Sequence, residues 1–435
     1  MRLLWPLIID QILIVLIGII DTVMVAHLGD AAVGGVSLVD SINVLVVNVF
    51  SALTTGGAVV CSQYLGRRNP SQASASAKQL VYITILISGA LVLLMFPGRL
   101  LVLKLIYGHI DPGIMKEAEI YFFFTILSYP FIALYLAGAA LFRTMGNSRV
   151  GMWISFLINV LNAVGNAVFI YLCGWGVAGA AAATLISRFV AALVIMYLLA
   201  NLKEAPINIR GMYPVRILPS IIKSILKVAV PNGIEGATFQ VGKLALAQLV
   251  STFGAAAIAG NAVGNIFMTM GNLPGIAIAQ AMIPVVGQSV GAGDFEGAKR
   301  YTKKLMFYSY VAMISFNTLN LLSMPLVFKL FAMSAESLAY GRLFGTIFCT
   351  AAMVFWIPAY GLPFALRAAG DAKYTMIVSA IAMWVVRVGV AYLLAYAFGV
   401  GAVCVWISMV CEWLVRGGGY IARWKSGKWQ EKRII

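Results

Sequence analysis

Charged residues are scarce in this sequence. Asp, Glu, Lys and Arg make up 11% of its 435 residues, whereas 62% are hydrophobic. Soluble domains carry about 25% charged residues and about 45 to 50% apolar ones. So few charges cannot cover the exterior of a soluble protein of this length, because a surface in water needs polar side chains. The composition excludes a soluble fold and predicts that most of the exterior faces lipid.

Histidine and cysteine are also rare, with two and five residues. With only His27 and His109, the sequence has no histidine cluster for a metal or a nucleophile triad. The five cysteines show no CxxC spacing, and four of them lie inside apolar runs, so we expect core residues and not a metal or redox site. The sequence therefore predicts that the protein is not an enzyme and that it holds no cofactor.

Long apolar runs follow one another along the chain. A helix needs about 20 apolar residues to cross the hydrocarbon core of a bilayer, and glycine and aspartate mark the turns between the runs. We therefore predict an all-α polytopic membrane protein with twelve transmembrane helices. Their approximate ranges are 3–28, 31–62, 79–106, 118–143, 150–172, 177–201, 228–252, 256–290, 304–331, 338–366, 374–398 and 400–424.

The basic residues divide unequally between the two sides of this topology. If the N-terminus is inside, 22 of the 31 Lys and Arg residues fall in inner segments. Cytoplasmic loops carry an excess of Lys and Arg, so we expect both termini in the cytoplasm. The net charge of +16 is then a topology signal, and we expect no nucleic-acid partner.

The sequence repeats itself at an offset of 225 residues, where Pro6 matches Pro231 and Asp10 matches Glu235. Because six helices separate the equivalent positions, we expect two six-helix bundles related by a pseudo-two-fold axis along the membrane normal. This duplication is typical of transporters, although channels, enzymes and scaffolds can also be duplicated. The predicted parts are an N-lobe (1–203), a cytoplasmic linker (204–227), a C-lobe (228–424) and a basic cytoplasmic tail (425–435).

Acidic side chains at membrane depth need a structural or functional explanation, because inserting each of them costs about 2.5 to 3.5 kcal/mol on insertion scales. With a rise of about 1.5 Å per residue, Asp21, Asn162, Asn166 and Thr184 fall at similar depths below the outer surface. One carboxylate, two amides and a hydroxyl could form an oxygen site for Na⁺ or a hydrogen-bonded proton carrier. Polar residues that only hold helices together are the alternative.

Further polar residues predict a central cavity or gate, formed by Asp10, Asp40, Glu235, Gln240 and Lys243. Asp10 and Glu235 each follow a proline by four residues, and a proline frees a backbone carbonyl, so bends are expected there. The alternative is a structural inner gate with neighbouring basic residues. Lys243, in the middle of its helix, can bind an anionic group or lose its charge on burial.

A structural ion pair is expected near the midplane between the last two helices. Arg387 and Glu412 lie on these helices at similar depth, and Arg416 follows Glu412 by one turn. Buried charges of this kind are tolerated when they neutralise one another.

Several short motifs occur in a fixed order. They are the run from Pro6 to Gly29 with Ile20-Asp21-Thr22, SQYLG at 62–66 with its repeat GQSVG at 287–291, NVLNAVGN at 159–166, GVAGAAAAT at 176–184, and E-W-x-x-R from Glu412 to Arg416. Together they resemble the multidrug and toxic compound extrusion (MATE) family of the polysaccharide-exporter superfamily. The resemblance spans nearly the whole chain.

The resemblance implies a secondary active antiporter that exports amphipathic, cationic drugs or metabolites in exchange for Na⁺ or H⁺. It implies alternating access of two lobes around a cavity. It also carries the N-lobe cation site onto Asp21, Asn162, Asn166 and Thr184, and a transport-linked bend of the first helix onto Pro6.

This sequence departs from the family pattern at two positions that bear on the coupling ion. Asn166 stands where several relatives have an aspartate, which removes a titratable group. Gln240 stands near a position where one branch needs a glutamate, so the sodium site of that branch is expected to be absent. A flippase for lipid-linked precursors is the alternative function. The expected partners are a small amphipathic substrate and the lipid bilayer, for a monomer in the inner (plasma) membrane of a bacterium.

Overall fold

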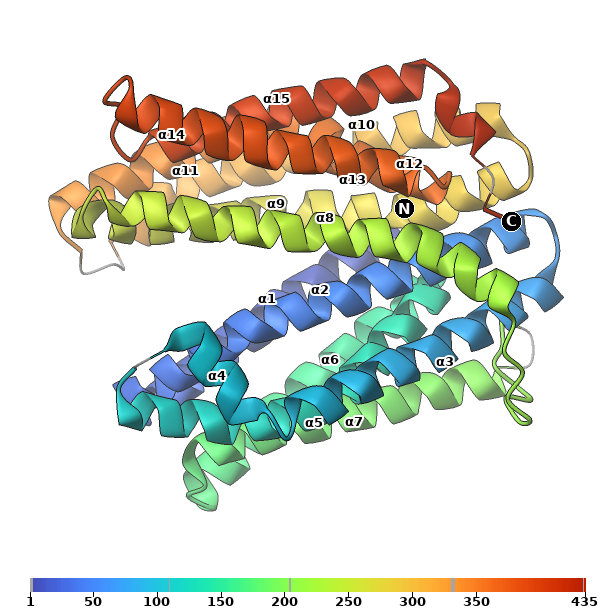
Figure 1. Ribbon diagram of the computed structural model, residues 1–435, viewed down its shortest axis with the longest axis horizontal. Helices are drawn as coiled ribbons and strands as arrows, with labels where there is room; N and C mark the ends of the chain where they lie inside the picture. The colour runs from blue at the N-terminus through green and yellow to red at the C-terminus, as the bar shows by residue number, and fades with distance from the viewer. Residues whose placement is uncertain (1–2, 109, 203–204, 330–332, 433) are drawn as a thin grey trace. The chain divides into compact units, whose positions relative to one another are not determined.

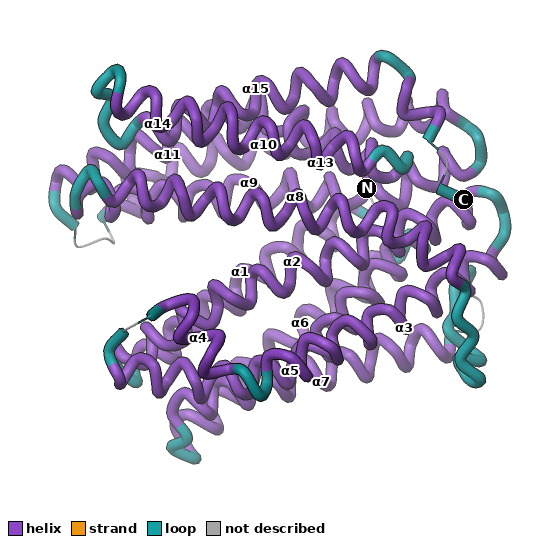
Figure 2. Tube along the Cα trace, viewed as in Figure 1, coloured by secondary structure: helices purple, strands orange, loops and turns teal. Residues whose placement is uncertain are grey.

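The computed structural model describes residues 3–108, 110–202, 205–329, 333–432 and 434–435, so His109 lies outside the described residues. Within these ranges the regular structure is helical and contains no strand (Figure 2). The chain forms two compact units, Met1–Ala229 together with Ile435, and Val230–Ile434.

The first unit is built around a long central helix. Its elements are α1 (Leu4–Ala26), α2 (Asp30–Gly66), α3 (Pro70–Met95), α4 (Arg99–Tyr107), α5 (Pro112–Thr144), α6 (Ser148–Asn166) with its π-helical continuation η1 (Ala167–Leu172), and α7 (Gly176–Asn201) (Figure 1). Helix α5 packs against α2, α3 and α7, and α1 packs against α6. The six long segments of this unit therefore share one core.

The second unit repeats this order. Its elements are α8 (Pro219–Ser251), which starts in the first unit, α9 (Ala255–Gly291), α10 (Phe295–Phe328), α11 (Ala335–Trp356), η2 (Ile357–Gly361), α12 (Leu362–Ala368), α13 (Ala372–Ile381), η3 (Ala382–Val388), α14 (Gly389–Tyr396), α15 (Cys404–Lys425) and η4 (Lys428–Glu431). Helix α9 packs against α10, α11 and α12, and α15 packs against η2 and η3. The π-helical segments η2 and η3 join their flanking α-helices without a break.

Counted as continuous segments, the described residues form twelve long helices, which confirms the predicted all-α fold. Ten of them are long and apolar enough to cross a membrane. The other two are α8 and α15, which carry buried charges, among them Glu235, Glu412 and Arg416. Large apolar side chains cover the exterior, with Leu93 and Leu172 exposed by 77% and 81%. Such a surface is stable only against lipid.

Several helices begin earlier than the hydropathy pattern predicted. The segments expected from 79, 228 and 304 begin at Pro70, Pro219 and Phe295. Their first turns are polar, so an apolar run does not include them, although proline in the first turn and an Asn or Asp cap are strong start signals. Asn69 accepts a hydrogen bond from the backbone N–H of Gln72 at the start of α3, and Asp294 does the same for Gly297 in α10. The last part of the linker predicted for 204–227 is therefore helical.

The helix predicted for 79–106 is interrupted. It ends as α3 at Met95 and resumes as α4 at Arg99. Pro97 and Gly98 stand between the two helices. Proline cannot continue the backbone hydrogen-bond ladder, which explains the break.

The two repeat-related prolines differ in their helices. Pro6 is the third residue of α1, and a residue in the first turn has no intrahelical acceptor for its N–H. The bend predicted at Pro6 is therefore not forced by a lost hydrogen bond in this structure. Pro231 instead lies inside α8, because α8 begins twelve residues before it. Only this second proline removes an interior helical hydrogen bond.

Candidate functional site

The structure brings together the four residues predicted for the N-lobe cation site. Asn166 Nδ2 donates to Asp21 Oδ1 at 2.6 Å and to Asn162 Oδ1 at 3.3 Å. Asn162 Nδ2 donates to Thr184 Oγ1 at 3.0 Å. A continuous hydrogen-bonded chain thus joins α1, α6 and α7. Both asparagines are fully buried.

Local sequence explains why these helices meet so closely. Asn162 and Asn166 are one turn apart on the buried face of α6. Between them, Gly165 faces α7, and a Cβ at that position would lie 2.8 Å from the Cβ of Ala183. The missing side chain lets α6 approach the residue before Thr184. The π-helical segment η1 starts directly after Asn166, and such segments are frequent at functional sites.

One buried oxygen at this site has no hydrogen-bond partner. Asn166 Oδ1 is buried and unsatisfied, whereas its amide nitrogen makes two bonds. With the Asp21 carboxylate, Asn162 Oδ1 and Thr184 Oγ1, it completes a set of oxygen atoms suited to a hard cation such as Na⁺. The single carboxylate in this set can equally be neutralised by one proton.

Two further charges of the first unit act on Asp21. Arg188, on α7, attracts the carboxylates of Asp21 and Asp40 and donates from Nη1 to Ser128 Oγ at 2.7 Å. Asp40 is exposed on α2 and accepts a hydrogen bond of 3.1 Å from Asn43 Nδ2. Asp40 repels Asp21, so a cation at Asp21 relieves this repulsion as well.

Asp10 occupies a separate buried site in the same unit. It accepts a short hydrogen bond from the hydroxyl of Ser155, which also lies 2.6 Å from the Tyr135 hydroxyl. Arg143 attracts the Asp10 carboxylate. The Asp10 side chain therefore links α1 to α5 and α6.

The second unit contains an ionic cluster that is almost completely buried. Glu235 Oε2 lies 2.8 Å from Arg367 Nη2, and Glu235 Oε1 lies 2.6 Å from Arg416 Nη2. Arg416 Nη1 contacts Glu412 Oε1 at 3.3 Å, and Arg387 Nη1 lies 3.6 Å from Glu412 Oε2. The three residues predicted as a structural ion pair are thus together, but the shortest contacts are those of Glu235.

Two tyrosines complete this cluster. The ring of Tyr360 lies 4.4 Å from Arg416 Cζ, and its hydroxyl donates to Glu412 Oε2 at 3.4 Å. Arg416 Nε donates to the Tyr420 hydroxyl at 3.2 Å. A cation on an aromatic face, with its remaining donors bonded, tolerates removal from water.

Arg367 is the residue of this cluster that the sequence pattern did not single out, because it was counted among the inner-segment cations. The internal repeat could have identified Arg367 as a partner of Glu235. Arg367 is equivalent to Arg143 at an offset of 224, just as Glu235 is equivalent to Asp10. Each unit therefore pairs an acid of its first long helix with an arginine from an equivalent helix.

Gln240 and Lys243 lie farther along α8. Gln240 is half-buried, and its side chain makes no hydrogen bond to any residue in the described ranges. Lys243 lines a cavity of about 100 Å³ together with Arg387. The predicted gate residues of the second unit are therefore split between the ionic cluster and this cavity.

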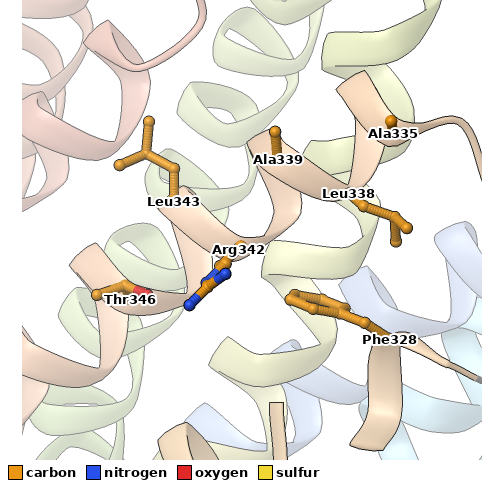
Figure 3. A pocket seen from close by; sticks show the side chains of 7 residues that line it. All are labelled: Phe328, Ala335, Leu338, Ala339, Arg342, Leu343 and Thr346. Atoms are coloured by element: carbon orange, nitrogen blue, oxygen red, sulfur yellow. The ribbon is translucent and has the colours of Figure 1, made fainter. Parts of the chain in front are cut away.

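A larger pocket, of about 570 Å³, lies at the junction of α10 and α11 (Figure 3). In that view Arg342 projects from α11 between Phe328 and Thr346. Its wall contains none of the predicted site residues.

Comparison with known proteins shows a duplicated match. A family model described as MatE matches residues 6–168 and again residues 231–393, two ranges separated by the 225-residue offset of the internal repeat. "Uncharacterized transporter YisQ" of Bacillus subtilis is 26% identical over 98% of this chain and 94% of its own length. "Probable multidrug resistance protein NorM" of Thermotoga maritima is 26% identical over 98% of this chain and 91% of its length.

Comparison with a solved structure supports the same fold. The structure described as "Crystal structure of MATE in the straight conformation" has a TM-score of 0.90 and 20% sequence identity, covering 99% of this chain and 96% of the other. The long helices described above therefore follow a known membrane-protein fold over the full length.

Proposed function

Because the chain belongs to the MatE family, and is therefore a multi-pass membrane transporter and not an enzyme, we propose that it exports amphipathic, cationic small molecules in exchange for Na⁺ or H⁺. Relatives named as multidrug resistance proteins support this substrate class. The bacterial origin of the two relatives named above supports the plasma membrane as its location. The flippase alternative has no support among the relatives reported above.

The hydrogen-bonded chain from Asp21 to Thr184 is the observation that supports cation coupling. In this proposal a cation or proton reaches Asp21 from outside and neutralises its carboxylate. Asn166 then loses a charged acceptor, so the contact of 2.6 Å between α1 and α6 weakens and α1 repacks. Substrate affinity falls as α1 moves, and the substrate leaves to the outside by alternating access.

The membrane potential drives this exchange when more positive charge enters than leaves in each cycle, whereas a one-for-one exchange of a monovalent cation is driven by the ion gradient alone. Each net positive charge that moves inward gains about 2.3 kcal/mol for each 100 mV. This corresponds to more than a tenfold concentration ratio of substrate.

Replacement of Asp21 by Asn tests the proposal. In proteoliposomes, we expect Asp21→Asn to reduce coupled dye efflux at least about tenfold, since the charge-assisted hydrogen bond and the titratable group are both lost. Asp30→Asn is the matched control, because it makes the same chemical change at an exposed residue at the start of α2. Normal efflux by a correctly inserted Asp21→Asn protein would exclude Asp21 as the coupling residue.

The coupling ion is identified by imposing the two gradients separately. An inward Na⁺ gradient at equal pH drives efflux if the oxygen set binds Na⁺, and an inward pH gradient without Na⁺ drives it if Asp21 carries a proton. In either case the response should be lost in Asp21→Asn and kept in Asp30→Asn. Efflux that follows neither gradient would contradict antiport.

A further inference from the structure

The cavity beside Lys243 has a basic wall. Its polar side chains are Lys243 of α8, Arg387 of η3, Asn261 and Asn265 of α9, and Trp406 of α15, and no acidic residue lines it. The volume is about 100 Å³. Sites for whole drug-sized ligands occupy about 300 to 1,000 Å³, so this cavity fits one functional group and not an entire drug.

The polar groups of this wall are oriented as donors. Trp406 Nε1 donates to Asn261 Oδ1 at 3.2 Å, which leaves the amide NH₂ of Asn261 free to donate. Asn265 follows one helical turn later on the same face of α9. Arg387 is 93% buried, and its Nε has no hydrogen-bond partner. Its ion pair with Glu412 is long, at 3.6 Å.

Positive charge is in excess around the cavity. The adjoining ionic cluster contains the two carboxylates of Glu235 and Glu412, which are shared by three arginines. Lys243 adds a further cation and makes no ion pair within the described part of the chain. Lys243 is exposed, whereas Arg387 is buried with one long ion pair, so an anionic ligand would offset the cost of burying the Arg387 charge.

Comparison of the two repeats shows that this cavity is the C-lobe counterpart of the N-lobe site and carries the opposite charge. At the offset of 225, Leu246 and Asn265 are the counterparts of Asp21 and Asp40. At the offset of 221, Val405 and Met409 are the counterparts of Thr184 and Arg188, and all four residues line the cavity. The second unit therefore lacks the acids of the first unit at equivalent positions and carries Lys243 and Arg387 beside them.

A close helix contact positions the two cations. Gly242 of α8 faces η3, and a Cβ there would lie 2.7 Å from Met383 Cγ. Lys243 follows Gly242 directly, and Arg387 follows Met383 by one helical turn. The approach of the two backbones therefore sets both side chains in one wall.

We infer that this cavity binds a carboxylate group of the transported substrate, with Lys243 and Arg387 as charge partners and the Asn261 amide as a donor. The planar guanidinium matches a carboxylate, and the apolar part of the substrate contacts Leu246, Met268 and Met409. The inference rests on the proposed export function and deepens it by assigning a site to the anionic group of a substrate.

A pair of dyes tests this inference by binding to the purified full-length protein, without any gradient. One dye is a cationic xanthene ethyl ester, and the other is its free carboxylic acid, which is zwitterionic at neutral pH. We expect the acid to bind about tenfold more tightly than the ester, because one charge-assisted hydrogen bond is worth about this factor. Fluorescence polarisation gives both dissociation constants.

Three variants test whether Lys243 causes the preference for the acid. Lys243→Met should remove most of the preference for the acid, and Lys243→Glu should reverse it in favour of the cationic ester. Lys303→Met, which changes an exposed lysine of α10, should keep the preference. Benzoate should displace the acid dye and leave the ester bound, since it competes only for the carboxylate site.

The outcomes separate the inference from the proposed function. Equal affinity of the wild-type protein for both dyes, or an acid preference that survives Lys243→Glu, overturns the inference even if efflux of the ester is normal. An acid preference in a protein that moves neither dye under any gradient supports the inference and contradicts the export function.

Discussion

Glu235 shows how one buried side chain organises its surroundings. It accepts from Arg367 and Arg416 at 2.8 and 2.6 Å, and the latter continues to Glu412. The sequence predicted a buried acid at this position but not its partners, because Arg367 was counted as a cation of an inner segment and Arg416 was assigned to Glu412. The N-lobe set around Asp21 was predictable because its four residues are polar, lie at equal depth and belong to three neighbouring helices.

Removal of the Glu235 charge should be strongly destabilising. Glu235→Gln leaves three buried arginines with the single carboxylate of Glu412, and breaking a buried ion pair in this way costs about 3 to 5 kcal/mol. We expect a clear decrease of the thermal unfolding temperature in detergent. Glu296→Gln is the control, because Glu296 pairs with Lys299 on the surface, where an ion pair contributes about 0 to 1 kcal/mol. Equal unfolding temperatures for the two variants would contradict a structural role of the cluster.

The helices show which part of the fold a hydropathy pattern can predict. The apolar runs predicted all twelve segments, although α8 and α15 are less apolar than the other ten. They missed the polar first turns of α3, α8 and α10, which are stabilised by caps and first-turn prolines and not by lipid. They also missed the π-helical segments η1, η2 and η3, since a local change of hydrogen-bond register leaves no mark in hydropathy.

Close helix contacts through glycine make a prediction at this scale. Gly242→Ala should destabilise the protein, because the added Cβ enters the side chain of Met383. Gly418→Ala should be neutral or stabilising by up to about 1 kcal/mol, since nothing lies within 4 Å of its Cβ position and alanine favours helix. Thermal unfolding of the two variants measures this difference in sign. A stabilising Gly242→Ala would show that α8 and η3 do not require the close approach.

The predicted orientation of the whole molecule rests on its charge distribution. With both termini inside, 22 of 31 basic residues lie on the cytoplasmic side, whereas few lie outside. No single loop determines this result, so the sequence alone is sufficient to predict it. The same distribution explains why a net charge of +16 does not require a basic interaction surface.

Cys173 provides a direct test of orientation. It is exposed between η1 and α7, on the predicted outer side, whereas Cys61, Cys349 and Cys404 are buried and Cys411 is half-buried within α15. A membrane-impermeant maleimide should label the protein in intact cells, and Cys173→Ser should abolish this labelling.

The opposite side is probed with a new thiol. In the Cys173→Ser background, Ser426→Cys places an exposed thiol just after α15. It should react only after the cells are permeabilised. Labelling of this second variant in intact cells would place the C-terminus outside.

The Glu235 cluster also affects how the protein is assembled, because the ribosome synthesises its helices one after another. Helix α8 emerges long before α12 and α15, which supply Arg367 and Arg416. Until α15 enters the bilayer, the nascent C-terminal half carries an acid without its full set of counter-charges, on a helix that is itself too polar to rank among the ten apolar spans. Biogenesis of this half is therefore completed by its last helix, and chains that stop before α15 should be substrates for membrane quality-control proteases.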